Sequence, residues 1–139
     1  MADRFVFDSY ALLALFQDEA GARQVQRLLG RAGKGDCALF ISVVSLGELL
    51  YVVESRRGLE AAQEVLAAFD QLPIETVAVD RTLALLAARM KAATSIGYAD
   101  CFVGALAQQV GGAIVSGDSD FRRIADVVPI EWLPAARAR

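Results

Sequence analysis

Four acidic residues fall at junctions between predicted elements: Asp8, Glu48, Asp100 and Asp118. Asp8 and Asp118 each follow a short apolar run typical of a buried strand, whereas Glu48 and Asp100 lie near the start of apolar helical patterns. Carboxylates that share one edge of a sheet repel one another unless a cation lies between them. Convergence of these four side chains would therefore predict a metal site.

The donor atoms decide which metal such a site would hold. The chain has no histidine, and its two cysteines, Cys37 and Cys101, stand far apart in no zinc-ligand pattern. Oxygen donors alone suit Mg²⁺ or Mn²⁺ and disfavour zinc and iron. A metal-activated water in a carboxylate cluster could hydrolyse a phosphodiester without a histidine base.

Each acid also has a purely structural explanation. Ser45 and Glu48 have capping-box spacing, which predicts that a helix begins at Ser45 and that Glu48 lies in its first turn. Asp8 and Asp100 can likewise cap helices, and Asp118 suits a tight polar turn. Taken singly, each acid fits this reading at least as well as the functional one.

The elements that must position the acids alternate between strand and helix. Strand-like runs cover residues 5–7, 39–44, 74–79, 113–116 and 127–132. Helical patterns cover residues 9–19, 22–29, 45–57, 59–72, 80–91, 98–110 and 121–125, with a flexible turn at 30–35. Helical crossovers predict a three-layer α/β/α sandwich with a mainly parallel sheet, and ligands of such sheets bind beyond the carboxyl ends of the strands.

Length and composition predict a single domain over residues 1–134, with a frayed tail at 135–139. The amino terminus resembles neither a secretory signal nor a membrane span, so we expect a soluble cytoplasmic protein with no membrane partner. The net charge of −3 argues against binding to nucleic acid, which normally requires a basic surface.

Four segments lie in order along nearly the whole chain: Phe5–Ser9, Ile41–Leu49, Tyr98–Ala107 and Ser116–Phe121. Together they resemble the PIN-domain nucleases and, within that family, the small VapC-type toxins of type II toxin–antitoxin systems. The resemblance implies a PIN-like fold, Mg²⁺- or Mn²⁺-dependent cleavage of RNA, a homodimer and inhibition by a cognate antitoxin protein.

The resemblance also implies roles for individual residues. The acidic, metal-binding and catalytic site would comprise Asp8, Glu48, Asp100 and Asp118, with Asp120 as a fifth metal ligand; whether Asp118 or Asp120 contacts the metal is open. Ser9 and Ser116 would be polar supports. We expect Arg122 and Arg123, which follow the acidic turn, to contact RNA, with Arg56, Arg57 and Lys91 also lining the groove.

Other functions compete with this interpretation. A receiver domain could use Asp80 but lacks the expected lysine after its last strand, and a haloacid-dehalogenase-type phosphatase would need a second acid at Tyr10. A dinucleotide-binding domain would need a glycine-rich first turn. A housekeeping RNA-processing PIN nuclease and a non-catalytic RNA- or protein-binding domain of the same fold stay open as alternatives.

Overall fold

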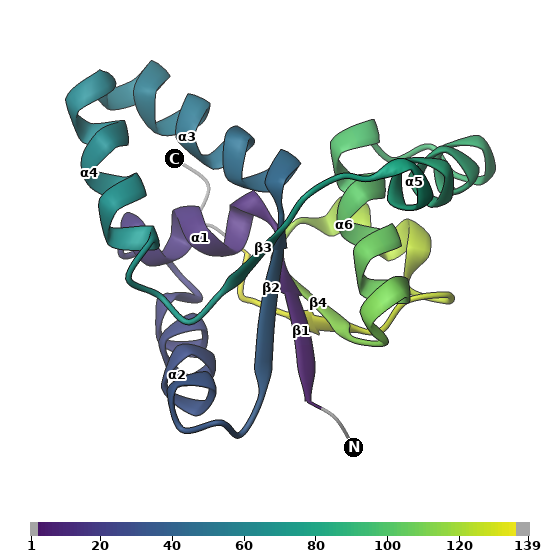
Figure 1. Cartoon of the computed structure of the whole chain (residues 1–139), viewed down its shortest axis with the longest axis horizontal. Helices are drawn as coiled ribbons and strands as arrows, with labels where there is room; N and C mark the ends of the chain where they lie inside the picture. Colours follow the sequence, from purple (N-terminus) through teal and green to yellow (C-terminus); the bar gives the residue numbers. More distant parts are fainter. Residues whose placement is uncertain (1–2, 136–139) are drawn as a thin grey trace.

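Five short strands form one sheet in which every neighbouring pair is parallel, in the order β3-β2-β1-β4-β5. The computed structural model describes residues 3–135 (Figure 1), so most of the predicted frayed tail lies outside the described residues. The strands are β1 (Arg4–Phe7), β2 (Ala38–Ser42), β3 (Glu75–Val77), β4 (Ala113–Ser116) and β5 (Ile130–Trp132). The predicted parallel sandwich is confirmed.

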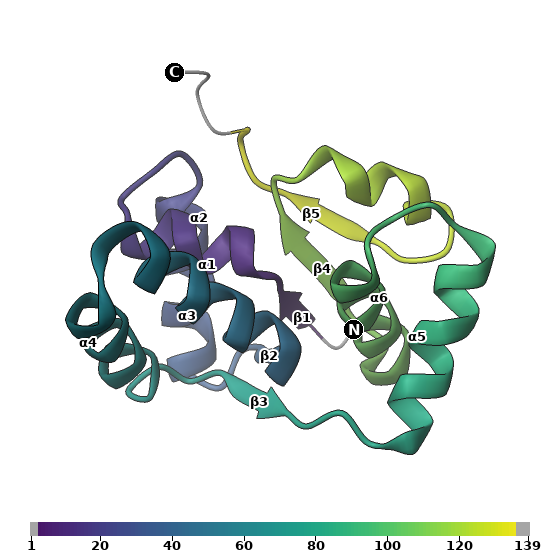
Figure 2. The same ribbon diagram turned by 90° about the horizontal axis from the view of Figure 1, so that it is seen from above.

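Helices cover both faces of this sheet. Four lie on one side, α1 (Ser9–Phe16), α2 (Ala22–Gly33), α3 (Val43–Arg57) and α4 (Leu59–Phe69). On the other side are α5 (Arg81–Ala93), α6 (Tyr98–Val110) and the short 3₁₀ helix η1 (Ser119–Ile124), as Figure 2 shows. In the part of the chain described, no helix combines the length and apolarity needed to cross a membrane.

Side-chain alternation along the strands creates a separate core on each face. Val6 and Ile114 pack with α5 and α6, whereas their neighbours Phe7 and Val115 pack with the helices of the first half. All four side chains are fully buried. Because both faces of the sheet are covered, its central strands read as continuous apolar runs in the sequence.

The strand order reverses direction between β1 and β4. From β1 the chain proceeds through β2 to β3 on one side, then crosses back to β4 and β5 on the other. In open parallel sheets, ligands bind in the crevice at such a switch point, beyond the carboxyl ends of the strands. Asp8 follows β1 and Asp118 follows β4, so both lie at this point.

Several predicted boundaries differ from the structure. The bounds of α6 and β4 match, but α3 begins at Val43 because the Ser42 hydroxyl accepts a hydrogen bond from the Val44 amide and caps the helix. The predicted capping box at Ser45 is therefore wrong. Helix α2 continues past Gly30 into the predicted turn, and β5 begins only after Pro129, which has no amide hydrogen to donate to a ladder.

Candidate active site

Asp8 combines a helix cap with a buried position at the switch point. Its Oδ1 accepts a hydrogen bond from the Ala11 amide at 3.0 Å, which caps α1, and its Oδ2 accepts one from the Ser116 hydroxyl at 2.6 Å. The side chain is only 4% exposed. Burial raises the Asp8 pKa to about 7. The two hydrogen bonds oppose this rise, and the charges of Asp100 and Asp118 add to it.

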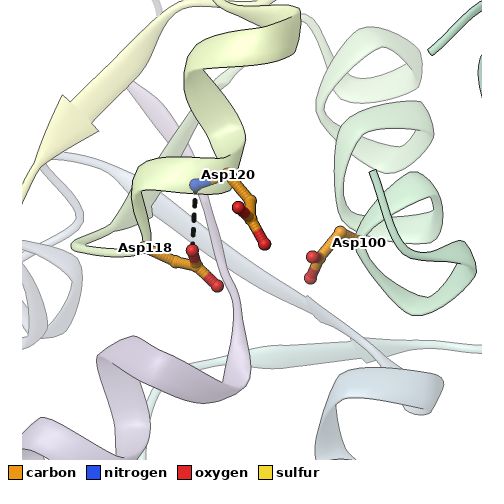
Figure 3. A group of neighbouring side chains, drawn as sticks. All are labelled: Asp100, Asp118 and Asp120. Atoms are coloured by element: carbon orange, nitrogen blue, oxygen red, sulfur yellow. Dashed lines mark hydrogen bonds between the residues drawn. The ribbon is translucent and has the colours of Figure 1, made fainter. Parts of the chain in front are cut away.

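Three further carboxylates gather opposite this position. One oxygen from each of Asp100, Asp118 and Asp120 lies within 4.8 Å of the others, and Figure 3 shows the three side chains turned toward one another from α6 and the start of η1. The Asp120 amide donates to Asp118 Oδ1 at 2.9 Å. Sequence reasoning left open whether Asp118 or Asp120 contacts the metal, and the structure places the carboxylates of both in this group.

Asp100 approaches the site from α6. It lies in the first turn of α6, but the cap residue of that helix is Gly97. Within residues 3–135, no hydrogen bond reaches the Asp100 carboxylate, which excludes a capping bond as its role. Burial first, and then the charges of Asp118, Glu48 and Asp120, raise its pKa to about 6.

Glu48 approaches the site from α3. Because α3 begins at Val43, Glu48 lies in the second turn rather than the first and does not cap the helix. Its Oε1 accepts a hydrogen bond from the Ser9 hydroxyl at 2.6 Å, and its charge acts on Asp100. Glu48 and Asp8 stand outside the tight group of three, but both interact electrostatically with Asp100.

Ser116 links the two switch-point strands at the site. Its hydroxyl donates to Asp8 and accepts a hydrogen bond from the Asp118 amide at 3.0 Å. Ser116 thus contacts Asp8, whereas Ser9 contacts Glu48. Sequence reasoning missed Tyr10, whose ring lies so close to Gly117 that a β-carbon there would be 2.5 Å from a ring carbon. The only sequence signal was a glycine between Ser116 and Asp118.

The carboxylates fit a hard divalent cation. Every available donor is an oxygen, and among the described residues no lysine or arginine forms an ion pair with Asp8, Glu48, Asp100, Asp118 or Asp120. Burial is the main cause of the raised pKa values of Asp8 and Asp100, and a cation would offset the repulsion between carboxylates that adds to it. Asp100, Asp118 and Asp120 could hold it directly, with Asp8 and Glu48 adjacent.

Basic residues are unevenly placed around this site. Arg122 and Arg123 are exposed on η1, directly after the acidic turn, and Arg123 Nη1 donates to the Ser95 carbonyl at 3.5 Å. Arg56 and Arg57 end α3, roughly 12–14 Å along the helix from Glu48. Lys91 Nζ donates to the Ile96 carbonyl at 2.8 Å. Only the η1 arginines therefore adjoin the acidic turn in sequence.

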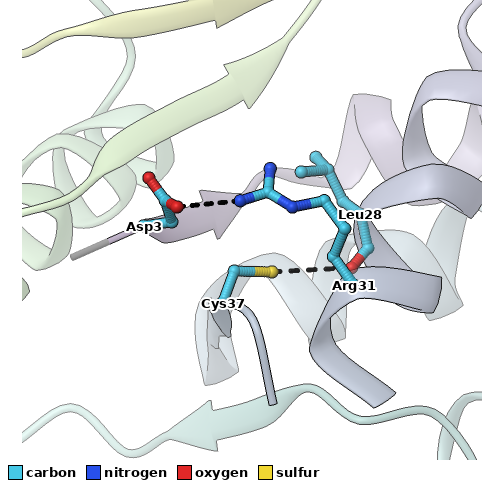
Figure 4. Close-up of polar contacts among 4 residues, drawn as sticks. All are labelled: Asp3, Leu28, Arg31 and Cys37. Carbon is cyan, nitrogen blue, oxygen red and sulfur yellow. Dashed lines mark hydrogen bonds and ion pairs between the residues drawn. The ribbon is translucent and has the colours of Figure 1, made fainter. Parts of the chain in front are cut away.

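The cysteines take no part in the site. Cys37 precedes β2 at the opposite edge of the sheet, where its thiol donates to the Leu28 carbonyl at 3.6 Å beside an Arg31–Asp3 ion pair of 2.9 Å (Figure 4). The Cys37 side chain is half-buried. Cys101 is buried in α6, and burial raises the pKa of both thiols, which makes them poor nucleophiles.

Similar solved structures share this architecture along almost the whole chain. A chain of the Rickettsia felis VapBC2 complex bound to a promoter DNA fragment has a TM-score of 0.73 at 17% identity, covering 94% of this chain and 98% of that one. DNA-bound VapBC from Salmonella typhimurium has a TM-score of 0.73 at 21% identity, and the match covers 94% of this chain and 98% of that one. Mycobacterium tuberculosis VapC20, described as a Sarcin-Ricin loop cleaving toxin, has a TM-score of 0.72 at 18% identity, and the match covers 94% of this chain and 99% of that one.

Sequence comparison identifies the family. No curated protein matches the chain. The sequence model of the PIN domain, however, matches residues 5–127, which include all five carboxylates of the site. The chain therefore belongs to the PIN domain family.

Proposed function

We propose that the chain is a metal-dependent endoribonuclease and the toxin of a toxin–antitoxin pair. The observation that carries the proposal is the convergence of acids from four separate segments on the switch point of the sheet, with Asp100 left without a hydrogen-bond donor in the described residues. Acids that served only to cap helices would not need to converge on one point of the sheet. Membership of the PIN domain family supports nuclease chemistry at the same residues.

Asp8, Glu48, Asp100, Asp118 and Asp120 form the proposed catalytic and metal-binding site. When bound, Mg²⁺ or Mn²⁺ would supply an acidified water and positive charge to offset the charge developing on the phosphate. Ser116 fixes the Asp8 carboxylate and the Asp118 backbone, and Ser9 fixes Glu48. Arg122 and Arg123 are the proposed contacts to the RNA backbone.

The relatives in fold supply the biological context of the proposal. Two of them come from VapBC complexes, and VapC20 is described as a toxin that cleaves the Sarcin-Ricin loop. By analogy we propose a cytoplasmic protein with an RNA substrate, a cognate antitoxin protein as inhibitor and a homodimeric state. A housekeeping RNA-processing nuclease would share the site but would have no antitoxin.

Cleavage of a mixed pool of cellular RNA by purified protein tests the nuclease activity. We expect cleavage with Mg²⁺ or Mn²⁺, none with chelator, and none by Asp100→Asn, which removes one site charge without touching the cap of α6. Asp70→Asn, a matched loss of charge at the exposed end of α4, should cleave normally. Metal-independent cleavage, or normal activity of Asp100→Asn, would refute the proposal.

Growth on induced expression separates a toxin from a processing enzyme. A toxin should arrest growth, and co-expression of a small protein encoded beside its gene should restore it. Metal-dependent cleavage in vitro without growth arrest would instead favour the processing nuclease.

A further inference from the structure

Trp132 ends β5 at the same edge of the sheet as the acids. It pairs in register with Ser116, and the preceding pair of Phe7 with Val115 places Asp8 beside Ser116. Asp8, Ser116 and Trp132 therefore occupy one row across three adjacent strands. Two strand spacings put the Trp132 backbone about 10 Å from that of Asp8. The tryptophan is thus within reach of a nucleotide neighbouring the site.

The side chain of Trp132 lies on the face of the sheet that carries the site. Ile130, two residues earlier on β5, packs into the core formed with α5 and α6, whereas Leu133 packs into the core on the opposite face. Because side chains alternate along a strand, Trp132 lies on the α6 side of the sheet. Its register partner Ser116 lies on the same side. Asp100 projects from α6 on this same side.

The backbone around Trp132 is held firmly although its ring is exposed. The Leu133 amide donates to the Ser116 carbonyl at 2.9 Å, and the Tyr10 hydroxyl donates to the Pro134 carbonyl at 3.2 Å. Leu133 itself is buried, whereas Trp132 is 39% exposed. A large aromatic ring fixed at its backbone and open to solvent can stack with little further loss of conformational entropy.

We infer that Trp132 is a stacking platform for an unpaired base of the RNA whose phosphate lies at the carboxylate site, an inference that rests on the proposed function. Aromatic rings bind single strands by stacking on base faces, which are covered by neighbouring pairs in a duplex. A negatively charged site cannot attract RNA by itself, so stacking would supply affinity that the acids do not. Trp132 thus provides the site with a contact to the base of a substrate nucleotide.

Fluorescence reports directly on this contact because Trp132 is the only tryptophan in the chain. In chelator, a mixed-sequence RNA oligonucleotide without self-complementarity should quench the emission, and the same RNA annealed to its complement should quench it far less. Anisotropy of labelled RNA measures binding independently. Binding of the single strand with unchanged Trp132 emission, or equal quenching by the duplex, would overturn the inference.

Variants connect the contact to catalysis. Trp132→Ala should raise the KM for single-stranded RNA about 10-fold, with a smaller effect on kcat, and Trp132→Phe should restore most of the loss. Leu59→Ala, which truncates an exposed side chain at the start of α4, should change neither constant. Circular dichroism checks that each variant is folded. An unchanged KM for folded Trp132→Ala would refute the inference.

The outcomes separate this inference from the proposed function. Metal-dependent cleavage with the same KM in Trp132→Ala removes the stacking role and leaves the nuclease intact. Quenching by single-stranded RNA without cleavage under any metal removes the nuclease and retains the stacking role. Emission that changes with protein concentration alone would show that a second copy covers Trp132, and would overturn the inference.

Discussion

Asp8 and Asp80 have nearly the same local structure and very different surroundings. Both cap a helix with extended backbone, at φ −98° and ψ −179° for Asp8 and φ −97° and ψ −179° for Asp80. Each accepts a hydrogen bond from the amide three residues later, at 3.0 Å from Ala11 and 2.8 Å from Leu83. Yet Asp8 is buried at the switch point, whereas Asp80 is exposed beyond the edge strand β3.

The difference shows that a helix cap and a functional site are not exclusive roles. The cap uses one carboxylate oxygen in both residues. In Asp8 the second oxygen accepts from Ser116 and lies near the charges of Asp100 and Asp118. Asp80, the acid that a receiver domain would phosphorylate, does not belong to the group of converging acids found among the described residues. Topology, rather than local sequence, separates the two aspartates.

The largest expected difference between them is in activity. Asp8→Asn should lower the rate of RNA cleavage by roughly 100-fold or more, because it removes a site charge. Asp80→Asn should change the rate by less than about twofold, since Asn caps a helix as well as Asp does. Initial rates with Mn²⁺ measure both. Equal rates for the two variants would show that Asp8 has no role beyond its helix cap.

The second-largest difference between the two aspartates should be in how stability depends on pH. The Asp8 pKa is raised from 3.8 to about 7 in the folded protein, so its stabilising contribution is complete below pH 4 and is lost as the pH rises toward 7. Without divalent metal, this loss amounts to roughly 4 kcal/mol of unfolding free energy. Asp100, with its pKa raised to about 6, adds to the fall.

Urea denaturation in chelator between pH 4 and pH 8 measures this dependence. Asp8→Asn should flatten the profile and be more stable than the wild type at pH 8, whereas Asp80→Asn should retain the wild-type slope. A flat wild-type profile would mean that Asp8 ionises without cost in the folded state.

The smallest expected effect isolates the cap itself. Asp80→Ala should lower the free energy of unfolding by about 1 kcal/mol through loss of the bond to the Leu83 amide. RNA cleavage at a temperature well below the unfolding midpoint should not change. Reduced cleavage by a fully folded Asp80→Ala would place this residue in the functional site and weaken the comparison.

Local patterns predicted the elements best where strong stop signals bound them. Helix α6 and strand β4 have the predicted bounds because Gly111, in the left-handed conformation, ends the helix. The start of α3 was predicted at Ser45, but Ser42 caps the helix because the chain turns directly at the end of β2.

The candidate site was predictable as a set of residues but not as a geometry. The spacing of the acids along alternating elements indicated convergence, and the tight group of Asp100, Asp118 and Asp120 agrees with it. The burial of Asp8 could not be read locally, since Asp80 has the same signature. The place of Trp132 beside Ser116 depends on strand register, and Tyr10 meets Gly117 only through tertiary packing.

Calorimetric titration of the protein with Mn²⁺ at pH 7.5 tests most directly whether the carboxylates form a cation site. The wild type and Asp80→Asn should bind Mn²⁺ saturably, and the affinity of Asp100→Asn should be weaker by about 10-fold or more. Absence of binding to the wild type, or equal affinity in Asp100→Asn, would contradict a cation site at these carboxylates.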